Sequence, residues 1–200
     1  MTSDRLLDAV TPWLERRLGA PLSALGRDPT PVLPPREDGV QRASLRALRL
    51  GDRGVVVARP EWVEPLRVRV SDLALDQLFT VFGAYEMARV TLPDEIAVWE
   101  PNWNIFADAE SLRPAEDPRP RRLGEDDFAR VDFNVFWHCE SAHPAAGFGV
   151  YEEDQLLALA TATDEGDPVM EIGVDVAPGA QGRGLGRAVI SAAGRWIVAQ

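Results

Sequence analysis

Three glycines fall within six residues near the end of the chain, at positions 181–186, which read QGRGLG. Glycine has no Cβ atom, so such a stretch lets successive backbone N–H groups converge and lets a ligand approach the backbone closely. Converging N–H groups bind anions, phosphate groups among them. The chemistry indicated by this stretch is therefore the binding of a phosphate-type anion.

A strand and a helix must position this turn. Residues 170–176 read MEIGVDV, in which apolar side chains alternate with Glu171, Gly173 and Asp175, and this period predicts a strand with one buried face. Pro178 and Gly179 end that strand. From Gly184 onward apolar residues recur every three or four positions, which predicts an amphipathic helix. Its first N–H groups have no partner within the helix, and its dipole favours negative charge there.

The two common nucleotide loops do not fit the spacing. A Walker loop needs G-x-x-x-x-G-K-[ST], and the chain contains no lysine. A dinucleotide loop needs G-x-G-x-x-G with an acidic residue about 20 positions further on. The glycines here are spaced G-x-G-x-G, and only fourteen residues follow Gly186.

The stretch resembles the acyl-CoA loop of the GNAT superfamily of N-acetyltransferases, whose pattern is [RQ]-x-x-G-x-[GA] after a strand that ends V-x-P. Gln181, Gly184 and Gly186 match the loop, and Val176 and Pro178 match the strand end. The resemblance continues more weakly back to about Arg121. It implies that acetyl-CoA is the co-substrate and that its pyrophosphate lies on the loop, with its pantetheine arm along the strand. The residues implied in binding are Val174, Val176, Gln181, Gly182, Arg183, Gly184, Leu185, Gly186 and Arg187.

Acetyl transfer to an amine needs a deprotonated nucleophile, a polarised thioester carbonyl and a protonated leaving thiol. In GNAT enzymes a glutamate on the strand before the loop often serves as the base. Glu171 is the nearest candidate here, and Asp175 projects to the same side of the strand. The resemblance therefore makes these two carboxylates the candidate catalytic residues.

His138, Cys139 and His143 lie close together in the sequence and raise the question of a metal site. A structural zinc site takes four ligands at recognised spacings, and the chain has no second Cys or His pair. Cys139 lacks a thiol-activating partner in the sequence, and GNAT enzymes transfer directly to the amine. We therefore predict neither a metal site nor a cysteine nucleophile.

The composition excludes some classes of partner. The formal net charge of −11 disfavours general binding to nucleic acids or membrane surfaces, which needs a basic footprint. One cysteine excludes an internal disulfide framework and fits a reducing compartment. All 21 basic residues are arginine, which suggests a bacterial genome rich in G and C. With no signal-peptide pattern at the start, we expect a cytoplasmic protein.

The chain is expected to contain two parts, an accessory α/β region at 1–118 and a GNAT-like acetyl-CoA-binding domain at 119–200. Residues 114–122, which read PAEDPRPRR, have the composition of a linker. In the first part we expect a helix that Ser3 caps and Gly19 ends, an extended connector at 21–39, two strands within 40–59, a helix from Ser71 to about Gly83 and a strand at 96–99. In the second part we expect a short strand and helix near Arg122, then a hairpin of strands at 147–151 and 156–163.

The expected fold class is α/β (α+β), a GNAT-like mixed sheet with flanking helices. A complete GNAT domain continues with further strands, so the sequence is expected to be a fragment, to be completed by another chain or by its own first 115 residues, or to be a shortened remnant. The leading hypothesis is N-acetyl transfer from acetyl-CoA to an amine of a small molecule or protein. The alternative is a non-catalytic CoA-binding or protein-interaction module, and an exposed strand edge would favour homodimerisation.

Overall fold

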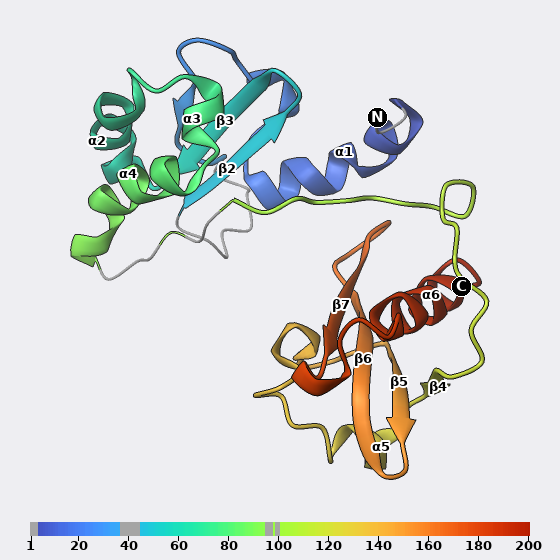
Figure 1. Ribbon diagram of the computed structural model, residues 1–200. Coiled ribbons are helices and arrows are strands. Elements are labelled where there is room, and N and C mark those ends of the chain that lie inside the picture. Colours follow the sequence, from blue (N-terminus) through green and yellow to red (C-terminus); the bar gives the residue numbers. More distant parts are fainter. Residues whose placement is uncertain (1–3, 37–44, 95–97, 99–100) are drawn as a thin grey trace. The chain divides into compact units, whose positions relative to one another are not determined.

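The computed structural model describes residues 4–36, 45–94, 98 and 101–200. The chain divides into two compact units, Met1–Ile105 and Phe106–Gln200, each with its own sheet (Figure 1). Both units combine a small sheet with helices, which confirms the predicted mixed α and β fold class. The boundary predicted between residues 118 and 119 lies further along the chain than the division between these units.

The sheet of the first unit has the order β1-β3-β2, formed by Val32–Leu33, Arg53–Ala58 and Leu45–Leu50. The central strand β3 is parallel to β1 and antiparallel to β2, and Gly51 makes the turn between β2 and β3 with a φ of +60°. Side chains of β3 alternate between two buried layers. Val55 and Val57 pack with Leu18 and Leu25, while Val56 packs on the opposite face with the helices that follow.

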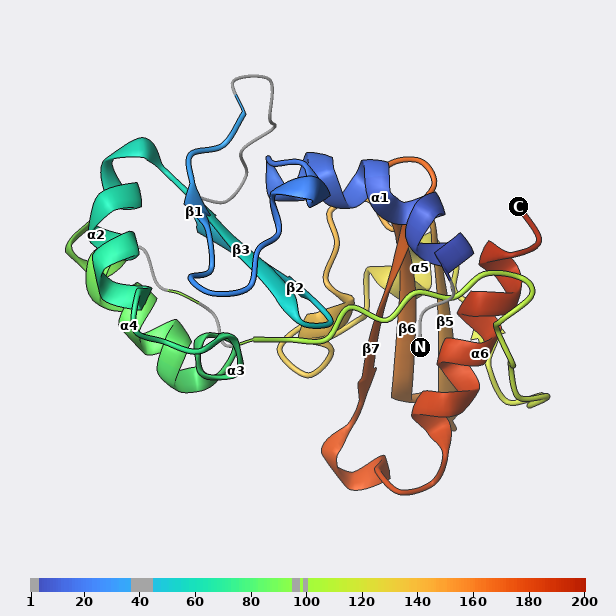
Figure 2. The same cartoon turned by 90° about the horizontal axis from the view of Figure 1, so that it is seen from above.

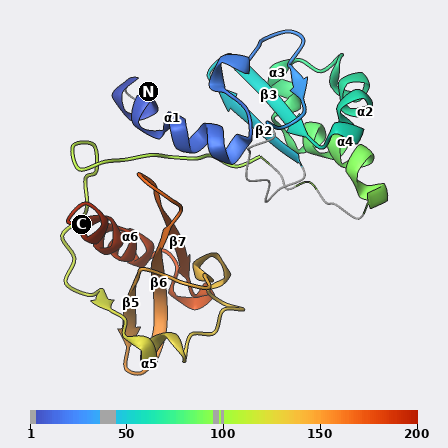
Figure 3. The same cartoon turned by 180° about the vertical axis from the view of Figure 1, so that it is seen from behind.

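Among the described residues, the helices that accompany this sheet are α1 (Asp4–Leu18), α2 (Pro60–Val70), α3 (Leu75–Leu78) and α4 (Val81–Thr91), together with the short 3₁₀ turns η1 (Leu22–Ala24) and η2 (Leu92–Asp94). Helices α2, α3 and α4 group on one side of the strands, as seen from behind in Figure 3. Gly19 follows α1 with a φ of +77°, as predicted for its end. Among the described residues no helix is both long and apolar enough to cross a membrane.

Several sequence predictions for the first unit were wrong. The helix expected from Ser71 to Gly83 is two helices, and Gly83 lies inside α4 rather than at a helix end. A Cβ there would lie 2.0 Å from the carbonyl oxygen of Leu78, which explains the glycine at this position. Helix α2 was missed, since it contains prolines at its start and in its interior. The connector expected at 21–39 contains η1 and the strand β1. The capping role of Ser3 and most of the strand expected at 96–99 lie outside the described residues.

The sheet of the second unit has the order β4-β5-β6-β7 and is antiparallel throughout. Its strands are β4 (Arg121–Arg122), β5 (Ala146–Glu152), β6 (Gln155–Asp164) and β7 (Met170–Val176). The predicted hairpin and the predicted strand at 170–176 are thereby confirmed. In this order β5 and β6 are the inner strands, and β7 ends the described sheet with Leu159 opposite Asp175 and Thr161 opposite Gly173.

Two layers cover the faces of this sheet (Figure 2). Helix α6 (Leu185–Ile197) packs on one face against alanines of β6 and the apolar side chains of β7. On the other face lie the helix α5 (Glu125–Phe128) and the 3₁₀ turn η3 (Trp137–Cys139), where Phe136 and Cys139 pack against Leu159. Residues of β7 therefore alternate between the layer of α6 and the layer of η3.

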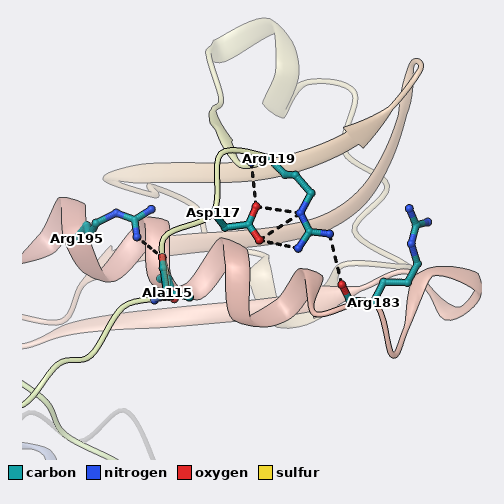
Figure 4. A network of polar contacts seen from close by, with 6 residues as sticks. Ala115, Asp117, Arg119, Arg183 and Arg195 are labelled. Atoms are coloured by element: carbon teal, nitrogen blue, oxygen red, sulfur yellow. Dashed lines mark hydrogen bonds and ion pairs between the residues drawn. The ribbon is translucent and has the colours of Figure 1, made fainter.

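The segment between residues 108 and 119 lies against α6. The backbone N–H of Ala115 donates to Ser191 Oγ at 2.9 Å, and the Arg195 guanidinium donates to the carbonyl of Ala115 (Figure 4). The side chain of Leu112 lies on Gly194, where a Cβ would come within 3.0 Å of it. These contacts join Leu112 and Ala115 to the second unit, while the location of the independent folding boundary stays a prediction.

Replacing Leu112 by alanine is expected to destabilise the second unit by about 1 to 2 kcal/mol, because a half-buried leucine side chain loses its contact with α6. Denaturant unfolding and hydrogen exchange at the Ala115 amide measure this effect. The matched control is Ile190→Ala, since Ile190 is 39% exposed on the same helix. A boundary at 118/119 would instead leave Leu112→Ala without effect and residues 106–118 exchanging as unfolded chain.

Candidate functional site

The turn between β7 and α6 is built on glycines with left-handed backbone. After β7 the 3₁₀ turn η4 (Pro178–Ala180) begins the reversal, and Ala180 N donates to Ala177 O at 2.8 Å. Gly182 and Gly184 then have φ angles of +76° and +74°. Residues with a Cβ rarely adopt this region, so the path of the turn depends on glycine at these two positions.

Seven consecutive backbone N–H groups in this turn have no hydrogen-bond acceptor among the described residues. Within the described part of the chain, none of the N–H groups of residues 181–187 donates a hydrogen bond, and the first helical bond of α6 runs from Ala188 N to Gly184 O. The positive end of the helix dipole adds to their partial charges. The turn is therefore a concentration of hydrogen-bond donors suited to an anion.

An open pocket of about 450 Å³ lies at this turn. Its lining residues are Val176, Ala180, Gln181, Gly182, Gly184, Leu185 and Gly186. Leu185 is 2% exposed and anchors the first turn of α6 in the core. Gly186 permits this packing, since a Cβ there would lie only 3.3 Å from Val176 Cγ2. Six of the nine residues implied in acetyl-CoA binding thus line one pocket.

The other three residues implied in acetyl-CoA binding do not line this pocket. Val174 packs into the core beneath α6. Arg183 is exposed and forms a two-bond ion pair with Glu152 at 2.7 and 3.3 Å. This contact raises the pKa of Arg183 and lowers the pKa of Glu152. Arg187 is exposed and makes no ion pair with any described residue.

Arg119 approaches the same turn from the segment before β4. Its Nη1 donates to Arg183 O at 3.4 Å, and its Nη2 would lie 4.0 Å from a Cβ at Gly184. Asp117 holds the guanidinium through bonds of 2.6 to 3.2 Å (Figure 4). Sequence reasoning missed Arg119 because the prolines around it indicated a linker. The sequence signal that could have identified Arg119 is the oppositely charged Asp117 two residues before it.

The η3 side of β7 holds the two candidate carboxylates. Glu171 is exposed near the start of the strand. Asp175 is partly buried and accepts two hydrogen bonds from His138, one from its backbone N at 2.7 Å and one at its ring Nδ1 at 2.6 Å. The sequence did not reveal this pair, because 37 residues separate its members.

Cys139 lies beside this pair but is buried. Its Sγ donates to Leu159 O at 3.3 Å, and burial, with a contribution from the charge of Asp175, raises its pKa to about 12. Such a thiol is a poor nucleophile and a poor metal ligand. Among the described residues no three His, Cys, Asp or Glu side chains converge as metal ligands.

The ion pair at Arg119 makes a testable electrostatic prediction. The Arg119 guanidinium lowers the pKa of Asp117 to about 2, and Arg119→Met is expected to move it toward 3.8 in a carboxyl-carbon NMR titration. Arg121→Met is the matched control, because Arg121 pairs with Asp127 and should move that pKa instead. Since the folded pKa of Asp117 is depressed, its pair stabilises the fold above pH 4 and is lost as pH falls toward 2. An unchanged pKa of Asp117 would contradict the pairing.

Comparison with known proteins identifies the second unit. Residues 106–200 match the family model described as the Acetyltransferase (GNAT) family. No curated protein and no solved structure matches the chain. The matched range coincides with the unit that carries the glycine turn, and the strand, turn and helix order is the one the family resemblance implied. Residues 106–200 of this chain therefore belong to the GNAT family of acetyltransferases.

Proposed function

We propose that this protein binds acetyl-CoA at the glycine turn and transfers the acetyl group to an amine of a small molecule or protein. The observation that carries the proposal is the row of unpartnered N–H groups at residues 181–187, which opens on a pocket within a GNAT-family unit. Backbone donors at a helix start suit the pyrophosphate of acetyl-CoA. Arg183 and Arg187 add positive charge beside it.

We infer that the thioester end of the co-substrate lies along β7. The edge of β7 that does not pair with β6 is free within the described sheet, and a polar chain such as the pantetheine arm can add to it along residues 174–177. Acetyl transfer then requires a base for the amine. Glu171 and Asp175 are the carboxylates that β7 offers for that role.

We also propose a cellular location, an oligomeric state and a class of acceptor. We place the protein in the cytoplasm, because its one cysteine is a free thiol. The free edge of β7 also allows a second copy to pair with it, so a homodimer is proposed as well. The formal net charge of −11 makes the chain strongly acidic, which favours amine acceptors over nucleic acids.

Calorimetric titration with acetyl-CoA is the direct test of binding. We expect one-to-one binding in the micromolar range, weakened at least about tenfold in the double variant Gly184→Val and Gly186→Val, because side chains there distort the turn and remove bonds to a charged ligand. Gly179→Val is the matched control, since a Cβ at Gly179 meets no atom within 4 Å and this residue does not line the pocket.

Two outcomes contradict the assignment of the turn, namely unchanged affinity in the double variant or an equal loss in the control. Turnover is then measured as thiol release with spermidine, tyramine and a lysine-containing peptide as acceptors. The buried Cys139 contributes little background to a thiol reagent while the protein is folded. Tight binding without turnover would favour the alternative, a non-catalytic CoA-binding or interaction module.

A further inference from the structure

The contact between η3 and β7 creates a histidine and carboxylate pair. His138 Nδ1 lies 2.6 Å from Asp175 Oδ1, and the backbone N–H of His138 donates to Asp175 Oδ2 at 2.7 Å. The carboxylate of Asp175 is only 11% exposed, while the imidazole is 50% exposed. One oxygen of the carboxylate thus holds the backbone of His138 and the other holds its ring.

The backbone of η3 is fixed independently of this pair. A Cβ at Gly173 would lie 2.1 Å from His138 O, so glycine at this position of β7 lets η3 approach the strand. Thr161 Oγ1 donates to Cys139 O at 3.1 Å, and Cys139 Sγ donates to Leu159 O. These contacts with β6 and β7 set the position from which His138 extends.

The partners of the ring determine its protonation chemistry. A carboxylate only accepts hydrogen bonds, so the ring nitrogen facing Asp175 must carry the proton. In the neutral ring Nε2 then holds a lone pair, and within the described residues it has no hydrogen-bond partner. A half-exposed imidazole oriented through its other nitrogen by a carboxylate is the arrangement of a general base.

The location of His138 suits an amine acceptor, an argument that rests on the proposed function. If the thioester lies along the free edge of β7, an amine can approach from either face of that strand. On one face α6 and the core fill the space around Val174 and Val176. On the other face, at the level of Asp175, the half-exposed ring of His138 meets solvent.

We propose that His138 is the general base of acetyl transfer and that Asp175 positions it. The amine nitrogen forms the amide C–N bond as the thioester C–S bond breaks. His138 Nε2 takes the proton that the amine loses, and the departing thiolate takes a proton from solvent. Acetyl-CoA supplies the activated acetyl group, so the step needs no further reactant.

Few other titratable groups surround this ring. Asp175 contacts it from β7, and Glu171 lies four positions earlier on the same face of that strand. Cys139 and Glu140 follow it in the chain, and β6 contributes Leu159 and Thr161, neither of which is a titratable residue. Glu171 is the competing candidate base, because it is an exposed carboxylate on the same face of β7. Unlike His138, it has no orienting partner among the described residues.

The first experiment requires no substrate. The chain has two histidines, so long-range ¹H–¹⁵N NMR of the ring nitrogens at high pH resolves both, and His143→Gln assigns them. We expect His138 to carry its proton on Nδ1 and expect Asp175→Asn to remove that preference. His138 as the Nε2–H tautomer in the wild type would overturn the orientation on which the proposal depends.

The second experiment measures acetylation of the best amine of the panel between pH 6 and 9. His138→Gln should lower kcat by about 10² to 10⁴-fold and abolish the fall in rate at acidic pH, with the Kd for acetyl-CoA unchanged. Asp175→Asn should lower kcat less, and Asp175→Glu should restore part of the loss. His143→Gln is the matched control and should match the wild type, because His143 is an exposed histidine whose backbone N–H donates to Ser141.

The outcomes distinguish a failure of His138 as the base from a failure of the proposed function. Normal acetyl-CoA binding with unchanged kcat in His138→Gln overturns the base, as does an equal or larger loss of kcat in Glu171→Gln. A parallel loss of acetyl-CoA binding in His138→Gln would assign His138 a structural role instead. Failure of the wild type to bind acetyl-CoA, or to acetylate any amine of the panel, overturns the proposed function and removes the base with it.

Discussion

Close packing of α6 on the sheet is the constraint on which the second unit depends. The positions of β6 beneath the helix are alanines, Ala158, Ala160 and Ala162, all fully buried. Small side chains allow a helix to approach a sheet closely, and Gly186 extends this approach to the end of β7. The helix therefore begins directly beside the strand, and its free N–H groups lie at the open pocket there.

The same strand carries different properties on its two faces. Because successive side chains of β7 point in opposite directions, Val174 and Val176 secure α6 while Asp175 and the space above Gly173 receive η3. A shift of one residue in the pairing of β6 and β7 would bury Asp175 under the helix and expose the valines. The register that stabilises the core is thus also the register that places the polar pair.

Contiguous features of this protein were predictable from sequence. The strand at 170–176, the glycine turn and α6 follow from local period and composition, and their family resemblance is confirmed for residues 106–200. Contacts across the sequence were not. Arg119 and Glu152 reach the turn, and His138 reaches Asp175, only because strand order and loop paths bring them there. In the first unit, the sequence pattern indicates a helix end at Gly83, although close contact with Leu78 explains the glycine there.

Under the proposed function, the net charge of the chain affects both the binding of phosphate and the reaction of the amine. Arg119 and Arg183 are already paired with carboxylates, and the chain carries a formal net charge of −11, so long-range attraction of an anionic ligand is weak. Binding of phosphate must then rest on short-range contacts, chiefly the backbone donors of the turn. The same acidic chain attracts amines, which arrive protonated at neutral pH and cannot attack a thioester in that form. An acidic protein that acetylates amines therefore needs a proton acceptor at the amine, and a histidine held by a partly buried carboxylate can meet that need without adding another exposed negative charge.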